Sequence, residues 1–162
     1  MKPTDVICTA VLPQGFEKGL AFAHQALAVK MPKDSRFSPQ LFLNRMHYLM
    51  AGKYAELAVE RFLRNHGIAH QSFTEKKSVT PLGRFFFRIK NENIEMKFFV
   101  LPDELATANK IVTAFALVPL NQWQQRARIS RYIFAAYTGD LRLILKQNVS
   151  TILAAQHVPS RD

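Results

Sequence analysis

Residues 85–100 read FFFRIKNENIEMKFFV, and this stretch decides the kind of fold. Apolar and polar side chains alternate over 85–90 and again over 94–100, a period typical of half-buried strands. Asn91-Glu92-Asn93 separates the two runs and is typical of a hairpin turn. The sequence therefore predicts a β-hairpin whose second strand presents Glu95 and Lys97 on one face. The opposite, buried face consists of Ile94, Met96 and Phe98.

The segment before the hairpin is predicted to be a long helix. Ser38-Pro39 is typical of a helix start, and His66-Gly67 is typical of a helix end. Between them, one stripe at spacings of three and four residues is apolar or small except for a single carboxylate, Glu56. The members of the stripe are Leu49, Gly52, Glu56, Val59 and Leu63.

The remaining segments complete a mixed α/β pattern. A helix is expected over 16–31, ahead of the long helix, and a polar segment without predicted structure covers 71–79. After the hairpin we expect a third strand over Ile111–Val118, a short helix over Gln122–Arg128 and a fourth strand over Arg131–Tyr137. Leu141–Leu145 is expected to extend the sheet, and Ser150 to begin a last helix. The prediction is a mixed sheet of four to five strands with a central hairpin, flanked by helices.

The chain of 162 residues suits one domain. We expect an N-terminal helical extension over 1–35, a core over 38–146 and a C-terminal helix over 150–157. Apolar residues at 48% exclude intrinsic disorder, and no apolar run approaches the roughly 18–20 residues of a membrane span. Cys8 is the only cysteine, so no internal disulfide is expected, and a reducing, cytoplasmic location is the simplest interpretation.

The charge balance predicts a polyanionic partner. The chain has 22 Lys and Arg against 12 Asp and Glu, a formal net charge of +10. Beyond Glu104 the only acids are Asp140 and Asp162, so the basic excess lies within the folded part. Such an excess attracts polyanions, of which nucleic acid is the commonest. Together with the order of motifs described below, it leads us to expect a basic patch that binds double-stranded DNA. Its expected members are Arg126, Arg128, Arg131 and Lys146.

Several short motifs follow one another in an order known from a nuclease family. Gly52-Lys53-Tyr54-Ala55-Glu56 stands on the predicted long helix, and Glu95-Met96-Lys97 on the second hairpin strand. Leu117-Val118-Pro119, with Gln122 just beyond it, and Tyr132-Ile133-Phe134 come later. In this order the sequence over 52–140 resembles the PD-(D/E)xK nuclease superfamily, whose fold is restriction-endonuclease-like.

The resemblance implies roles for four residues and a cofactor. Glu95 would bind a metal, Mg²⁺ in an active enzyme, and Lys97 would position or activate the attacking water. Glu56 would complete the metal site or orient its waters, and Gln122 would match a glutamine near the active site. The residues alone leave other interpretations open: a solvated charge pair for Glu95 and Lys97, a rim glutamate paired with Lys53 or Arg64 for Glu56, and a surface residue for Gln122.

One position departs from the family pattern. The family places an Asp on the first hairpin strand, where this sequence has Phe86, and no Asp occurs between Asp34 and Asp103. A phenyl ring cannot coordinate a hard cation, which requires oxygen ligands. The sequence therefore predicts a DNA-binding protein with a nuclease-like fold that is weak or inactive as an endonuclease. The alternative is a small basic α/β module that binds an acidic protein; a homodimer is compatible with both.

Overall fold

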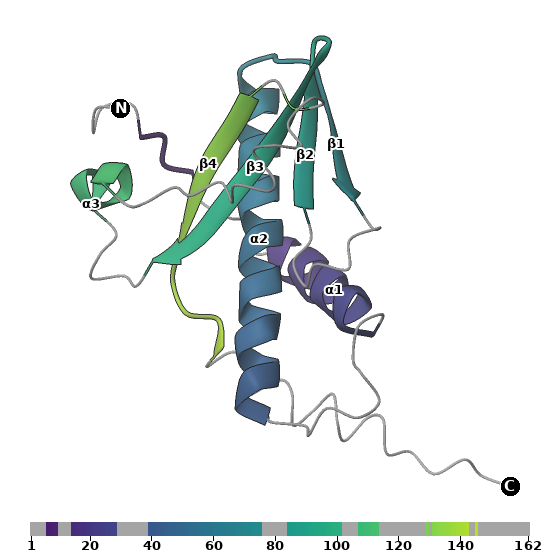
Figure 1. The fold of residues 1–162 in the computed structure, drawn as a ribbon, viewed down its shortest axis with the longest axis vertical. Helices are drawn as coiled ribbons and strands as arrows, with labels where there is room; N and C mark the ends of the chain where they lie inside the picture. The colour runs from purple at the N-terminus through teal and green to yellow at the C-terminus, as the bar shows by residue number, and fades with distance from the viewer. Residues whose placement is uncertain are drawn as a thin grey trace, which may run out of the picture.

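The computed structural model describes residues 6–9, 14–28, 39–75, 84–101, 107–113, 129, 131–142 and 145. These residues form a mixed α/β fold, as predicted, in which a four-stranded sheet is flanked by helices (Figure 1). In chain order the elements are α1 (Gln14–Ala28), α2 (Pro39–Asn65), β1 (His70–Glu75), β2 (Arg84–Ile89), β3 (Glu92–Leu101), α3 (Ala108–Thr113) and β4 (Arg131–Thr138). Within the described ranges, no helix is long and apolar enough to cross a membrane.

The sheet is mixed and has the strand order β1-β2-β3-β4. β1 pairs with β2 and β2 pairs with β3 in antiparallel fashion, and β4 runs parallel to β3. The predicted hairpin is confirmed as β2 and β3. Its turn is shorter than predicted, because Glu92 already pairs with Ile89 and only Lys90 and Asn91 lie between them. Lys90 has a φ of 54°, the left-handed conformation that tight two-residue hairpin turns require.

Helix α2 is the long helix predicted from sequence, and it begins and ends where its signals indicate. At its C-terminus Gly67 has a φ of +65°, which a residue without Cβ adopts without strain. The N–H of Ile68 donates to the Leu63 carbonyl at 2.9 Å, and the N–H of Gly67 to the Arg64 carbonyl at 3.0 Å. These bonds satisfy carbonyls that the last helical turn would otherwise leave without a partner.

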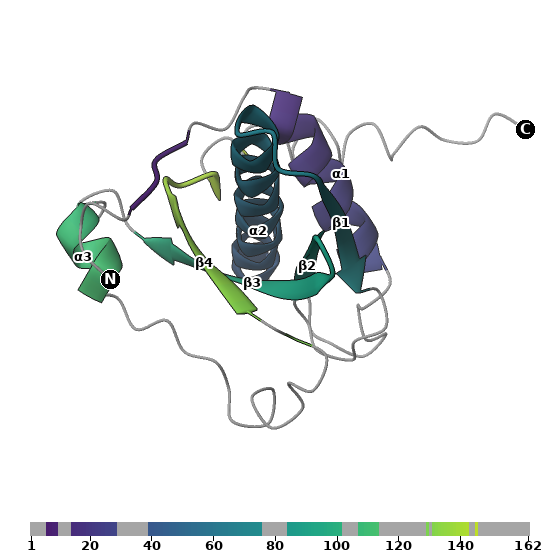
Figure 2. The same cartoon turned by 90° about the horizontal axis from the view of Figure 1, so that it is seen from above.

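Two hydrophobic clusters hold the helices and the sheet together, and α2 contributes to both. Leu43, Met46, Leu49 and Met50 of α2 pack with Ala23 and Leu27 of α1 in one cluster, together with Leu141 and Leu145. Ala55 and Leu63 pack in the other cluster against the strand residues Phe85, Phe87, Ile94 and Met96. Seen from above, α1 and α2 lie on the same side of a sheet that curves around α2 (Figure 2). The predicted stripe of α2 is thus the side of the helix that faces the core.

At Gly52, the backbone of α2 lies in close contact with side chains of the sheet. A Cβ built at this position would lie 2.6 Å from Cζ of Phe98 and 2.9 Å from Cε2 of Phe85. Carbon atoms in contact sit about 3.5–4.0 Å apart, so only glycine permits this spacing. The glycine of the Gly-x-x-x-Glu motif therefore has a packing role in this fold.

Three predictions of secondary structure were wrong or incomplete. Ile111–Thr113 belong to helix α3 and not to a strand, because the chain must cross from the end of β3 to the start of a parallel β4. Of the expected extension of the sheet over Leu141–Leu145, the described residues Leu141, Arg142 and Leu145 are not in a strand. The N–H of Leu145 donates to the Leu141 carbonyl, as in a helical turn. Strand β1 forms within the polar segment for which no structure was predicted.

Other predicted segments lie outside the described residues. These are the remainder of the expected third strand (114–118), the short helix over Gln122–Arg128 and the last helix over 150–157. The expected strand over Arg131–Tyr137 is confirmed as β4.

Candidate functional site

The hairpin presents the acid-x-Lys motif as an ion pair between Glu95 and Lys97. Lys97 Nζ donates to Glu95 Oε1 at 2.6 Å. The pair is not solvated: Glu95 is 1% exposed, although its residue type favours the surface. Lys97 Nζ also lies 5.9 Å from the centre of the Tyr132 ring, within the range of a cation–π interaction. The motif is therefore a buried, neutralised pair beside an aromatic ring.

The pair lies on the face of the sheet that points away from α2, which we call the far face. Ile94 and Met96 of β3 pack in the cluster with α2, so the intervening Glu95 and the following Lys97 point to the opposite side. Residues directly paired across strands share a face. The far face includes Gln71, Phe73, Phe86, Arg88, Glu95, Lys97, Tyr132 and Phe134.

The strand register places a phenyl ring beside the motif carboxylate. Phe86 of β2 is directly opposite Glu95 of β3, the alignment expected from sequence. Phe86 is itself buried and stacks on Phe73 of β1, with ring centroids 5.3 Å apart and an angle of 11° between the rings. Its neighbours Phe85 and Phe87 point to the other side, into the core. An apolar stack thus fills the position where a second carboxylate would be needed.

Glu56 is also buried, but it belongs to α2 and not to the far face. It accepts a hydrogen bond from Lys53, one turn earlier on the same helix, and forms an ion pair with it, as one of the interpretations from sequence expected. The rim position of that interpretation was wrong, because Glu56 is buried. Burial raises the pKa of Glu56, and the hydrogen bond from Lys53 opposes that rise. Because α2 covers the face opposite to Glu95, each carboxylate has its own lysine on its own side of the sheet.

The donor set around these carboxylates does not fit a resident divalent cation. Mg²⁺ requires several oxygen ligands, and here two carboxylates on opposite faces are each neutralised by an ammonium group. Across the described part of the chain, no group of three or more His, Cys, Asp or Glu could hold a metal ion. The arrangement supplies buried ion pairs and aromatic surface, but few oxygen ligands.

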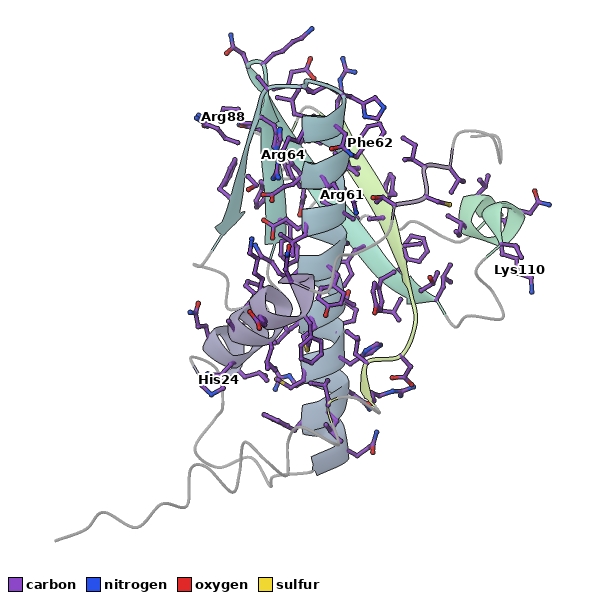
Figure 3. The ribbon with its side chains drawn as sticks, turned by 180° about the vertical axis from the view of Figure 1, so that it is seen from behind. His24, Arg61, Phe62, Arg64, Arg88 and Lys110 are labelled. Atoms are coloured by element: carbon purple, nitrogen blue, oxygen red, sulfur yellow. The ribbon has the colours of Figure 1, made fainter. Side chains whose placement is uncertain are left out.

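Basic side chains gather at the end of the molecule where α2 ends. The antiparallel and parallel pairings bring the starts of β1, β3 and β4 and the end of β2 to this same end. Figure 3 shows Arg61 and Arg64 of α2 and Arg88 of β2 there. Lys90 and Arg131 lie at the same end by register. We call these five residues the basic end.

Carboxylates at the basic end are fewer than its cations. Arg131 Nε lies 2.8 Å from Glu92 Oε2, in a pair whose two side chains are largely exposed to solvent. Glu60 accepts a hydrogen bond from Ser72, which ties β1 to α2. Among the described residues of this end, these two are the only acids that the elements contribute. The basic end therefore carries a net positive charge.

Of the binding residues expected from sequence, only Arg131 can be placed. Gln122, Arg126, Arg128 and Lys146 lie outside the described residues. Sequence reasoning missed Arg61, Arg64 and Arg88, because Arg88 of β2 is far in the chain from the two arginines of α2 and only the fold brings the end of β2 to the end of α2. Comparison of the chain with protein-family models, with curated proteins and with solved structures found no match.

Proposed function

We propose that this protein binds double-stranded DNA through the basic end, using a nuclease-like core that no longer hydrolyses phosphodiesters. The observation that carries the proposal is the gathering of Arg61, Arg64, Arg88, Lys90 and Arg131 at one end of the fold. Lys and Arg side chains neutralise DNA phosphates and release counterions, the main source of affinity that does not depend on base sequence. A net charge of +10 adds long-range attraction to the same partner.

The nuclease-like part of the proposal rests on the order of the elements. A helix with Gly52 and Glu56 precedes a hairpin whose second strand carries Glu95 and Lys97, and a further strand with Tyr132 follows beside it. This is the order of helix, hairpin and later strand in the PD-(D/E)xK superfamily that the sequence resembles. The similarity supports a shared core and says nothing by itself about catalysis.

The inactive part of the proposal rests on the surroundings of Glu95. Hydrolysis of a phosphodiester by this class of nuclease needs a metal that lowers the pKa of its bound water and neutralises charge at phosphorus. Phe86 stands where Glu95 would need a carboxylate neighbour, and Lys97 already neutralises Glu95 at 2.6 Å. The residues that remain on the far face would hold such a metal weakly.

Two assays on the full chain test the proposal. In a gel-shift titration at low salt, we expect the protein to retard duplexes of unrelated sequence with similar affinity. In a supercoiled-plasmid assay with Mg²⁺ or Mn²⁺, we expect no cleavage above that of a Lys97→Ala control. Failure to bind any duplex would refute the binding function and favour an acidic protein partner. Cleavage that disappears in Lys97→Ala, while that variant still binds the duplex, would show that a further carboxylate completes an active site.

A further inference from the structure

The far face carries a second feature at its β1 edge that the proposed function does not use. Phe73 of β1 is a large apolar residue that is 41% exposed. Its ring lies parallel to that of Phe86, which pairs with it across the strands and supports it from one side. Because β1 is the last strand in the order of the sheet, no described strand lies beyond Phe73.

Polar and cationic groups surround the exposed ring. The guanidinium carbon of Arg88 lies 5.9 Å from the centre of the Phe73 ring, and Gln71 is the direct strand partner of Arg88. Gln71, Ser72, Phe73 and Arg88 line an open, shallow hollow at the β1 edge with a volume of about 510 Å³. The hollow therefore combines the aromatic ring of Phe73, the positive charge of Arg88 and the side-chain amide of Gln71, which can both donate and accept hydrogen bonds.

We propose that Phe73, backed by Phe86 and flanked by Arg88 and Gln71, forms a platform on which an unpaired nucleic-acid base stacks. An aromatic ring that stacks on a base needs the face of that base to be free, a condition that an intact duplex does not meet. Arg88 would contact the neighbouring phosphate, and the Gln71 amide is placed for the edge of the base. The proposal rests on the DNA-binding function above and names its substrate class: DNA with unpaired nucleotides next to a duplex.

Charge decides between this occupant and an apolar protein segment. Arg88 belongs both to the hollow and to the basic end, so the platform is continuous with the surface proposed to bind the duplex. Arg88 Nε donates to the neutral Asn93 side chain at 3.3 Å, so the charge of the guanidinium is not compensated there. A polyanion whose bases have π-faces would compensate that charge and also stack on the Phe73 ring, whereas an apolar peptide would cover the ring and leave the charge uncompensated. Arg131 of the same end is ion-paired with Glu92.

The test compares a blunt duplex with the same duplex carrying a short single-stranded overhang that contains 2-aminopurine. Wild-type protein is expected to bind the overhang duplex more tightly, by roughly 5- to 100-fold for one stacked base, and to quench the 2-aminopurine fluorescence. Phe73→Ala is expected to remove the preference and the quenching while keeping the affinity for the blunt duplex. Phe73→Leu, which keeps apolar volume but has no π-face, is expected to behave like Phe73→Ala. Phe73→Trp, which keeps a π-face, is expected to retain both the preference for the overhang and the quenching.

Leu41→Ala is the matched control, because Leu41 is another exposed large apolar residue and lies near the start of α2, at the opposite end of the helix. It is expected to leave both signals unchanged. If wild-type protein binds the blunt duplex without preferring the overhang, the platform is refuted while the DNA-binding function stands. If it binds neither, both are refuted. If Phe73→Ala weakens both duplexes equally, or Phe73→Leu keeps the quenching, Phe73 acts through sheet packing and the platform is refuted.

Discussion

Lys97 matters for folding because of the charge it neutralises. Glu95 is almost wholly inaccessible to solvent, and an isolated carboxylate in such a place is costly. Removing one partner of a buried ion pair leaves the other charge uncompensated, whereas replacing both partners is much less harmful. The effects of substituting Glu95 and Lys97 on the free energy of unfolding are therefore expected to depend on each other.

The prediction at this position concerns the free energy of unfolding. Lys97→Met is expected to lower it by about 3 kcal/mol, and the double variant Glu95→Gln with Lys97→Met is expected to recover most of that loss. Urea unfolding followed by circular dichroism measures both, with Lys110→Met on α3 as an exposed control. Equal stabilities of wild type and Lys97→Met would mean that Glu95 does not depend on this lysine.

His47 is a second buried titratable residue whose protonation bears on stability. Its Nδ1 accepts a hydrogen bond at 3.3 Å from the backbone N–H of Leu141, so the ring is neutral in the folded protein. Burial lowers its pKa below 6.5, Asp140 opposes that shift and Arg142 adds to it. The unfolded chain therefore binds a proton near pH 6.5 that the folded protein does not bind until lower pH.

The contribution of His47 to the free energy of unfolding is accordingly expected to decrease as the pH falls from about 7 to about 5. Burial raises the pKa of Glu56, which acts in the opposite direction, so the informative quantity is the difference between wild type and a variant. His47→Asn, which keeps an acceptor for Leu141 but cannot titrate, is expected to lose less stability over this range. Urea unfolding at several pH values measures it, with His24→Asn on α1 as the control. A steeper loss in His47→Asn than in wild type would contradict this sign.

Among the elements, α2 illustrates a conflict between local preference and packing. Alanine is a better helix former than glycine by about 1 kcal/mol, yet a methyl group at Gly52 would overlap the rings of Phe98 and Phe85. Overpacking of a core typically costs about 1–3 kcal/mol. Both rings belong to the hydrophobic cluster between α2 and the strands, so they have little room to move aside. We therefore expect the cost of overpacking to exceed the gain in helix propensity at this site.

Gly52→Ala is therefore expected to destabilise the protein by about 1 kcal/mol, as measured by thermal or urea unfolding. Gln25→Ala, on an exposed position of α1, serves as the helix-propensity control and is expected to stay within about 0.5 kcal/mol of wild type. A gain in stability for Gly52→Ala would show that α2 and the sheet are separated by more space than the structure indicates.

The elements also show which parts of the fold the sequence could predict. Helix α2 and the hairpin were predictable, because their patterns of burial repeat with the periods of a helix and of strands. Strand β1 was not, since His70–Glu75 contains a single large apolar residue, Phe73, and forms a strand by pairing with β2. The β-branched pair Ile111-Val112 favoured a strand locally, but the parallel arrangement of β3 and β4 requires a crossover there.

The candidate site was predictable only in part, for reasons of the same kind. Alternation along β3 correctly placed Glu95 and Lys97 on one face, and the register of the hairpin correctly placed Phe86 beside Glu95. The burial of Glu95 could not be read from the sequence, because it depends on what packs over the far face. The basic end could not be predicted either, since Arg61, Arg88 and Arg131 come from three different elements.

At the scale of the whole molecule, the proposed source of DNA affinity is the positive charge of the basic end. Each phosphate that a lysine or arginine neutralises adds about −0.9 to the slope of log affinity against log salt for duplex DNA. Lys110 on α3 lies away from the basic end in Figure 3 and carries the same charge, which makes it a suitable comparison. A variant of the basic end and a variant of Lys110 should therefore differ in slope.

The most direct test is the salt dependence of duplex binding, followed by fluorescence anisotropy for wild type, Arg64→Ala and Lys110→Ala. The account predicts that wild-type affinity falls steeply from low to moderate salt. It further predicts that Arg64→Ala reduces the slope by about one and that Lys110→Ala leaves it unchanged. Absence of duplex binding at low salt, or equal slopes for Arg64→Ala and wild type, would contradict the account.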